Sequence, residues 1–173
     1  MDNRHRQQNT GIHRTAQTQI RCIQINLQHS KAATYNLLKT TDTDETDIIF
    51  IQEPCAYQNR PAGIGKEYRI FTAGTGKHRS AILIRSSNID AIIITKISDE
   101  DTVVLELIYN NLKFYAASMY LDIKEQLAKY LNKMDEIMEL TKRGKILIAA
   151  DTNSRSKTWH DLITNTRGKK LEE

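Results

Sequence analysis

Five polar residues stand where apolar segments of the chain end, and their types suit chemistry on a phosphate group. They are Asn26, Glu53, Tyr120, Asp151 and Asn153. The first four each close a short apolar run, and the fifth follows two positions after the fourth. Ligand sites of open α/β sheets lie at the carboxyl ends of the strands. We therefore expect the five side chains to meet if these strands run side by side with the same polarity.

The residue types indicate one kind of reaction. Glu53 and Asp151 offer hard carboxylate oxygens, which suit Mg²⁺ because that ion takes one or two carboxylates and keeps several waters. Asp151 can also orient or deprotonate an attacking water, and the Tyr120 hydroxyl can donate to charge that develops at phosphorus. Asn26 and Asn153 can donate N–H groups to phosphate oxygens. Together these groups are the parts of a metal-assisted phosphodiesterase.

The segments that must position these residues alternate between strand and helix near both ends of the chain. Residues 20–25 and 47–53 are apolar runs typical of buried strands, and Ser30 is a suitable N-cap for a helix between them. A second helix is predicted over residues 122–143 from apolar residues at helical spacing, with Asp122 as its N-cap. It leads into an apolar strand that ends at Asp151.

The middle of the chain is predicted to form strands joined by short connections. These strands cover residues 68–73, 80–86, 90–95, 102–109 and 112–120. The pair Asn110-Asn111 suits a tight hairpin turn between the last two strands. One or two helical turns are expected from Trp159 to Thr166. The whole pattern predicts an α/β fold, with one mixed sheet or two packed sheets and the helices outside.

The composition describes one globular domain with basic ends. The 173 residues carry 25 Lys and Arg against 21 Asp and Glu, a net charge of +4. Residues 1–18 are expected to form a polar, basic, disordered arm, and residues 19–173 the domain. The chain lacks a run of about 18 apolar residues and an apolar signal region, so we expect no membrane span and a nuclear or cytoplasmic protein, not a secreted one.

Four further residues are candidates for contacts with a nucleic acid. Lys77 and Arg79 lie in the basic loop GTGKHR, which could touch a phosphate backbone or be a plain hairpin loop. The sequence there does not match a phosphate-binding loop, because His78 stands where Ser or Thr is required. Arg155 and Trp159 add a cation and an aromatic surface near the C-terminal end.

These motifs resemble those of the endonuclease/exonuclease/phosphatase superfamily, and more narrowly the endonuclease domain of non-LTR (LINE-like) retrotransposons. The resemblance covers about residues 20–165 and keeps the motifs in order. The matching segments are QINLQHSKAATYNLL (24–38), DIIFIQEP (47–54), SAILIRS (80–86), AASMY (116–120) and IAADTNSRSKTW (148–159). The last segment also carries Ser156 and Trp159, which resemble the retrotransposon form of the motif.

The resemblance implies a four-layer α/β/β/α sandwich and a DNA endonuclease that uses Mg²⁺ or Mn²⁺ and nicks target DNA for reverse transcription. It implies that Glu53, Asn26 and Asp151 bind the metal and that Tyr120 lies beside the scissile phosphate. Asp151 would activate water or protonate the leaving oxygen, and Asn153 would assist at the phosphate. The implied partners are DNA and a reverse transcriptase, which continues the chain or associates with it.

Two departures from the family pattern keep other functions open. Ala150 stands where many relatives have Gly, and the closing Ser-Asp-His segment of the family is absent. We therefore expect a fold that is incomplete at its C-terminus and a slow nuclease, since the missing histidine would donate to the phosphoryl oxygens. An inactive remnant that keeps the fold and weak DNA binding is one alternative. A phosphodiesterase for a small phosphorylated substrate is the other.

Overall fold

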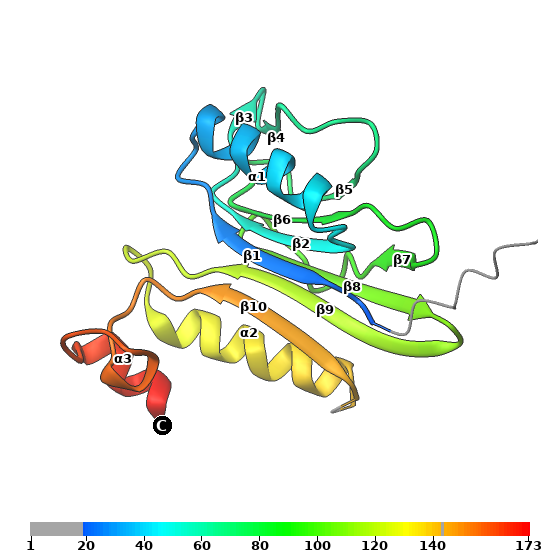
Figure 1. Cartoon of the computed structure of the whole chain (residues 1–173). Coiled ribbons are helices and arrows are strands. Elements are labelled where there is room, and N and C mark those ends of the chain that lie inside the picture. Colours follow the sequence, from blue (N-terminus) through cyan, green and yellow to red (C-terminus); the bar gives the residue numbers. More distant parts are fainter. Residues whose placement is uncertain (1–18, 143) are drawn as a thin grey trace, which may run out of the picture.

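Two four-stranded sheets pack face to face, and a helix covers the outer face of each (Figure 1). The computed structural model describes residues 19–142 and 144–173. The predicted arm of residues 1–18 lies outside the described residues. Among the helices of the part described, none is long and apolar enough to cross a membrane.

The first sheet has the strand order β1, β2, β6, β5, and its central strands are fully buried. Strand β1 (Cys22–Asn26) runs parallel to β2 (Ile48–Gln52), and α1 (Lys31–Thr43) connects them. Ser30 caps α1 as predicted, because its hydroxyl accepts the Ala33 N–H at 3.2 Å. The remaining strands are antiparallel neighbours: β6 (Ser80–Ile84) and β5 (Arg69–Phe71). The loop between β2 and β5 holds a small hairpin of β3 (Ala56–Tyr57) and β4 (Arg60–Pro61).

The second sheet has the strand order β10, β9, β8, β7. Strand β10 (Ile146–Asp151) runs parallel to β9 (Leu112–Tyr120), while β8 (Thr102–Tyr109) and β7 (Asp90–Ile93) continue it antiparallel. The predicted hairpin turn is confirmed: Asn110 and Asn111 join β8 to β9 with φ of 49° and 62°. Asparagine tolerates this left-handed conformation better than most residues.

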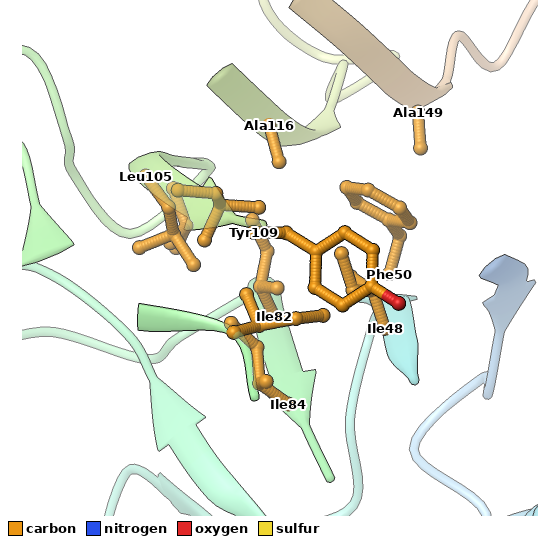
Figure 2. Packing of buried hydrophobic residues seen from close by; sticks show 11 residues of the cluster. Ile48, Phe50, Ile82, Ile84, Leu105, Tyr109, Ala116 and Ala149 are labelled. Atoms are coloured by element: carbon orange, nitrogen blue, oxygen red, sulfur yellow. The ribbon is translucent and has the colours of Figure 1, made fainter. Parts of the chain in front are cut away.

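Three apolar layers hold the sandwich together. Between the sheets, Ile48 and Phe50 face Ala116 and Ala149, as Figure 2 shows. Leu37 of α1 packs on the outer face of the first sheet. Helix α2 (Leu127–Leu140) covers the outer face of the second sheet with Leu127, Tyr130 and Ile137. The order of layers is thus α/β/β/α, which confirms the predicted four-layer sandwich.

The predicted helix of residues 122–143 is too long, and Asp122 is not its N-cap. Helix α2 begins at Leu127 after Gln126, which makes no side-chain cap. The Asp122 carboxylate instead accepts the Lys124 N–H at 2.9 Å in a turn and pairs with Arg79. These competing partners keep Asp122 outside the helix.

The C-terminal end also differs from the prediction. The expected helical turns after Trp159 are absent between residues 160 and 165. A short 3₁₀ turn, η1 (Lys157–Trp159), precedes this stretch, and α3 (Thr166–Glu172) follows it. Asn165 caps α3 by accepting the Gly168 N–H at 2.7 Å. A glycine inside a seven-residue helix lowers the intrinsic stability of the helix, which explains why no clear helix pattern is visible in these residues.

Candidate active site

The five predicted site residues lie together where β1, β2, β9 and β10 end. Asn26 of the first sheet makes the central contact, because its amide Nδ2 donates to Glu53 Oε2 at 3.0 Å and to Asp151 Oδ2 of the second sheet. Asn153 joins through its backbone N–H, which donates to Asp151 Oδ1 at 3.1 Å. The convergence expected from the strand ends is therefore present in the structure.

Tyr120 completes the cluster. Burial raises the pKa of its phenol, and the negative charge and side chain of Glu53 raise it further, while the side chain of Asn153 offsets part of the rise. The hydroxyl therefore stays protonated near neutral pH and can donate a hydrogen bond. A protonated phenol beside two site residues is suited to stabilising negative charge on a phosphoryl oxygen.

Hydrogen bonds fix the two loops that carry Glu53 and Asn153. Glu53 has a φ of 47°, and its N–H donates to the Arg79 carbonyl at 2.8 Å while its carbonyl accepts the His29 N–H at 2.8 Å. Asn153 has the same φ, and its Nδ2 donates to the Leu121 carbonyl at 3.2 Å. Left-handed backbone at residues other than glycine carries strain that surrounding structure must hold. These bonds hold it and aim both side chains at the cluster.

A buried amide next to the site ties the two sheets to each other. Gln52, the residue before Glu53, is fully buried, and its Nε2 donates to the Ser118 hydroxyl of β9 at 3.0 Å. This bond crosses the interface between the sheets close to the strand ends. It therefore restrains the relative position of the residues that each sheet contributes.

His29 and Lys77 extend the site on the Glu53 side. His29 Nδ1 lies 3.1 Å from the Pro54 carbonyl, which can only accept, so Nδ1 carries the proton. Its Nε2 lies 3.1 Å from Lys77 Nζ and 3.4 Å from Glu53 Oε1. Lys77 thus brings a positive charge to the edge of the cluster, and the possible contact of its loop with a phosphate backbone stays a prediction.

Arg79 is the centre of an ion-pair network beneath Tyr120. Its Nε and Nη2 donate to both carboxylate oxygens of Asp101 at 2.5 and 2.6 Å, and its Nη1 donates to Asp122. Tyr130 donates to Asp101 at 3.2 Å and accepts the Asp122 N–H at 3.0 Å. The guanidinium carbon lies 5.4 Å from the centre of the Tyr120 ring.

The pKa values of this network follow from its burial and contacts. Burial raises the pKa of Asp101, and the bonds from Arg79 and Tyr130 offset only part of that rise. Burial raises the pKa of Tyr130 to about 12. Burial by itself lowers the pKa of Arg79, but the bonds and charges of Asp101 and Asp122 raise it overall. The Arg79 guanidinium thus pairs with two carboxylates beside the Tyr120 ring, and its predicted contact with a nucleic acid stays a prediction.

Arg155 and Trp159 lie on the segment after β10. Arg155 pairs with Asp161 through bonds of 2.8 to 3.1 Å. Trp159 is 41% exposed, and its Nε1 donates to the Ser154 carbonyl at 3.4 Å. Ser156 is fully buried and donates to Glu172, so it holds the segment against α3. Among these residues, the exposed indole is the surface most accessible to a base.

The cluster contains two carboxylates, which are ligands of the type that a divalent cation such as Mg²⁺ prefers. One oxygen of Glu53 and one of Asp151 converge on the same amide nitrogen of Asn26, and Glu53 is only 21% exposed. The Asn26 Oδ1 accepts the Gln28 N–H at 2.8 Å. Within residues 19–142 and 144–173, no group of three or more His, Cys, Asp and Glu side chains is arranged to hold a metal. Two converging carboxylates are nevertheless what Mg²⁺ usually takes from a protein.

Comparison with known proteins agrees with this fold. No model of a known protein family matches the chain, and no curated protein matches it. Among solved structures, the endonuclease domain of TRAS1, a telomere-specific non-LTR retrotransposon, is 23% identical with a TM-score of 0.79. The match covers 89% of this chain and 68% of that one.

Two other solved structures show the same architecture with lower similarity. D. rerio TDP2 complexed with a single-strand DNA product is 18% identical, with a TM-score of 0.56, covering 78% of this chain and 61% of that one. An endonuclease/exonuclease/phosphatase family protein from Leptotrichia buccalis is 13% identical, with a TM-score of 0.52, covering 79% and 67%. The chain therefore has the endonuclease/exonuclease/phosphatase fold and spans about two thirds of the length of these proteins.

The residues that support the five site residues were not predicted from the sequence. His29, Asp101 and Tyr130 gave no signal, because each is far in sequence from its partner at the site. The sequence pattern predicts Asp122 as a helix cap and not as a partner of Arg79. Arg167 of α3 was also missed, although it lies against the loops that carry Tyr120 and Asn153.

Proposed function

We propose that the chain is a divalent-metal-dependent phosphodiesterase that cleaves DNA, of the kind found in retrotransposon endonuclease domains. The observation that carries the proposal is the meeting of Glu53 and Asp151 on the amide of Asn26, with Tyr120 and Asn153 alongside. The proposal takes residues 19–173 as the phosphodiesterase domain. Residues 1–18 then add positive charge for a nucleic-acid partner.

The proposed division of labour follows from the contacts. Asp151, whose two oxygens are fixed by Asn26 and by the Asn153 N–H, accepts a proton from the attacking water. The water oxygen bonds to phosphorus, the bond to the leaving oxygen breaks, and that oxygen takes up a proton from solvent water. The Tyr120 hydroxyl donates to a phosphoryl oxygen as negative charge develops there.

Glu53 and Asp151, with Asn26, are the residues that would hold the cation. A bound Mg²⁺ or Mn²⁺ supplies Lewis-acid stabilisation of the phosphoryl oxygens. Asn26 also acts without the metal. Its side-chain N–H groups donate to Glu53 and Asp151 and so hold together two carboxylates that would otherwise repel each other.

DNA is the substrate that the surroundings of the site favour. Lys77 lies beside His29 and Glu53, and Trp159 exposes an aromatic surface on the segment that follows Asp151. A cation that neutralises phosphates and an aromatic face on which bases stack are features of nucleic-acid binding. The TRAS1 neighbour, an endonuclease domain of a retrotransposon, supports the same choice. We extend the proposal to association with a reverse transcriptase and to a nuclear or cytoplasmic place of action.

A small phosphorylated substrate is the second candidate. A mannosyl-6-phosphatase from Bacteroides thetaiotaomicron has the same fold, at 10% identity and a TM-score of 0.53 over 86% of this chain and 67% of that one. The fold therefore does not by itself choose between DNA and a small phosphate ester.

A substrate panel separates these candidates and the inactive remnant. The whole chain is incubated with Mg²⁺ or Mn²⁺ and supercoiled plasmid, a single-stranded oligonucleotide, a small phosphodiester, or a sugar phosphate. We expect plasmid nicking and no turnover of the small esters. Turnover of a small ester without nicking would replace DNA as the substrate. If a folded chain turns over none of these substrates, the result would contradict the proposed activity and favour the inactive remnant.

A further inference from the structure

Arg167 of α3 joins the two loops that carry the site residues of the second sheet. Its guanidinium donates to backbone carbonyls only. The acceptors are Thr152 (3.0 Å from Nε), Glu125 (3.2 Å from Nη1), Leu121 (3.2 Å from Nη2) and Asp122 (3.3 Å from Nη2). Three of them belong to the loop after β9 and one to the loop after β10. A single side chain thus spans both loops.

The acceptors are the neighbours of the site residues themselves. Leu121 follows Tyr120 in the chain, and Thr152 separates Asp151 from Asn153. The Leu121 carbonyl accepts from Arg167 Nη2 and also from Asn153 Nδ2, both at 3.2 Å. A shift of Arg167 would therefore move the acceptor that orients the Asn153 side chain.

Helix α3 is fixed against the loop after β10. Arg167 is therefore held on a rigid support. The Asn165 N–H donates to the Arg155 carbonyl at 3.0 Å, and the Asn165 side chain accepts the Gly168 N–H at 2.7 Å. Gly168 is buried, and a Cβ there would lie only 2.0 Å from the Arg155 carbonyl oxygen. The backbone of α3 and that of the loop after β10 approach so closely that only glycine fits.

The bonding pattern requires arginine. A guanidinium presents five N–H donors in a planar fork, whereas a lysine ammonium is a single point that cannot reach carbonyls on both loops. Among the described residues Arg167 makes no ion pair, so its role is not to neutralise a carboxylate. Its guanidinium carbon also lies 6.0 Å from the centre of the Tyr130 ring, on the helix behind the site.

We propose that Arg167 is a positioning residue of the site, which holds Tyr120 and the Asp151–Asn153 turn in the relative placement that the reaction needs. This inference rests on the proposed phosphodiesterase function. A small displacement of a reacting or orienting group, caused by a change away from the chemistry, can cost about 10²-fold in rate.

The test uses the full chain and three variants that disturb this support in different ways. Arg167→Met removes all four bonds, Arg167→Lys keeps the charge but loses the fork, and Gly168→Ala keeps Arg167 but pushes α3 away from the loop. Lys169→Met is the matched control, since it removes one exposed cation from the same helix. Each protein is measured by the NMR signals of the Asn153 side-chain amide and by metal-dependent plasmid nicking.

We expect Arg167→Met and Gly168→Ala to shift the Asn153 amide signals and to lower kcat about 10²-fold with a much smaller change in KM. Arg167→Lys should retain part of the activity, and Lys169→Met should leave kcat and the Asn153 signals unchanged. A thermal melt of each variant checks that it is folded. If Arg167→Met unfolds, the decision rests on Arg167→Lys and Gly168→Ala.

The two readouts separate this inference from the proposed function. Unchanged Asn153 signals or unchanged kcat in the folded variants would overturn the positioning role. If the Asn153 signals shift in the variants but the parent chain cleaves no phosphodiester, the structural coupling would be confirmed. The proposed function would then be rejected.

Discussion

Replacement of Arg79 by methionine should lower the free energy of unfolding by about 3–5 kcal/mol at pH 7. The reason is that the change leaves the Asp101 carboxylate buried without its cation, and breaking a buried pair from one side typically costs that amount. Methionine keeps most of the apolar volume of the arginine stem, so little of the loss comes from packing.

The contacts of Asp101 support the size of this effect. Its side chain is 8% exposed, and it accepts two bonds from Arg79 at 2.5 and 2.6 Å. The variant retains only the weaker bond from Tyr130 at 3.2 Å. The exposed pair of Arg155 and Asp161 is the matched control, because Arg155→Met removes a cation from a carboxylate that water can solvate. That variant should unfold at nearly the same denaturant concentration as the parent chain.

The effect should depend on pH with a defined sign. Burial raises the pKa of Asp101 in the folded chain above its unfolded value of about 3.9. The stability contributed by this group is therefore fully present below the unfolded pKa and is lost as the pH rises through the folded pKa. Arg79 lowers the pKa of Asp101, so its removal raises that pKa further. The difference between parent and Arg79→Met is thus largest near pH 7 and shrinks towards pH 4.

Denaturant unfolding at pH 7 and pH 4.5 measures this prediction. The double variant Arg79→Met with Asp101→Asn should be less destabilised than the sum of the two single variants, because the second change removes the unpaired charge. A loss below about 1 kcal/mol for Arg79→Met, or equal losses at the two pH values, would show that Asp101 does not depend on Arg79 for its charge in the folded chain.

Four further predictions concern the site. Tyr120→Phe should lower the rate of DNA nicking about 10²–10³-fold because one hydrogen-bond donor is lost, and it should leave the melting temperature nearly unchanged. The pKa of the Tyr120 phenol should lie above its ordinary value because burial and Glu53 raise it, and NMR of labelled tyrosine measures this shift. Glu53→Ala should abolish Mg²⁺ binding, and equal affinity of parent and variant in calorimetry would contradict the metal site. Trp159→Ala should weaken binding to single-stranded DNA about 10-fold or more through lost stacking, without lowering kcat.

The strand ends of the site could be predicted because the pattern that defines them is local. A buried strand is a short apolar run, and Glu53 or Asp151 is recognisable as the polar residue that closes it. The parallel pairing of β1 with β2 and of β9 with β10 then brings the ends together. Sequence alone could not show that the two pairs belong to different sheets, since apolar runs are alike in both.

The supporting residues could not be predicted because their partners are distant in sequence. Arg79 is 22 residues from Asp101 and 43 from Asp122, and no local pattern links them. Arg167 bonds only to backbone carbonyls, which any residue type could supply. The prediction for Asp122 was wrong because an aspartate before an apolar helical pattern is commonly a helix cap.

Metal-dependent nicking of supercoiled plasmid, compared between the chain and Asp151→Asn, shows whether the clustered residues form one active site. The five clustered residues are predicted to form one phosphodiesterase site. Conversion to open circle should therefore require Mg²⁺ or Mn²⁺, fall at least about 10²-fold in Asp151→Asn, and persist in the Lys169→Met control. Equal nicking by the parent chain and Asp151→Asn, or nicking that survives removal of divalent metal, would contradict the claim.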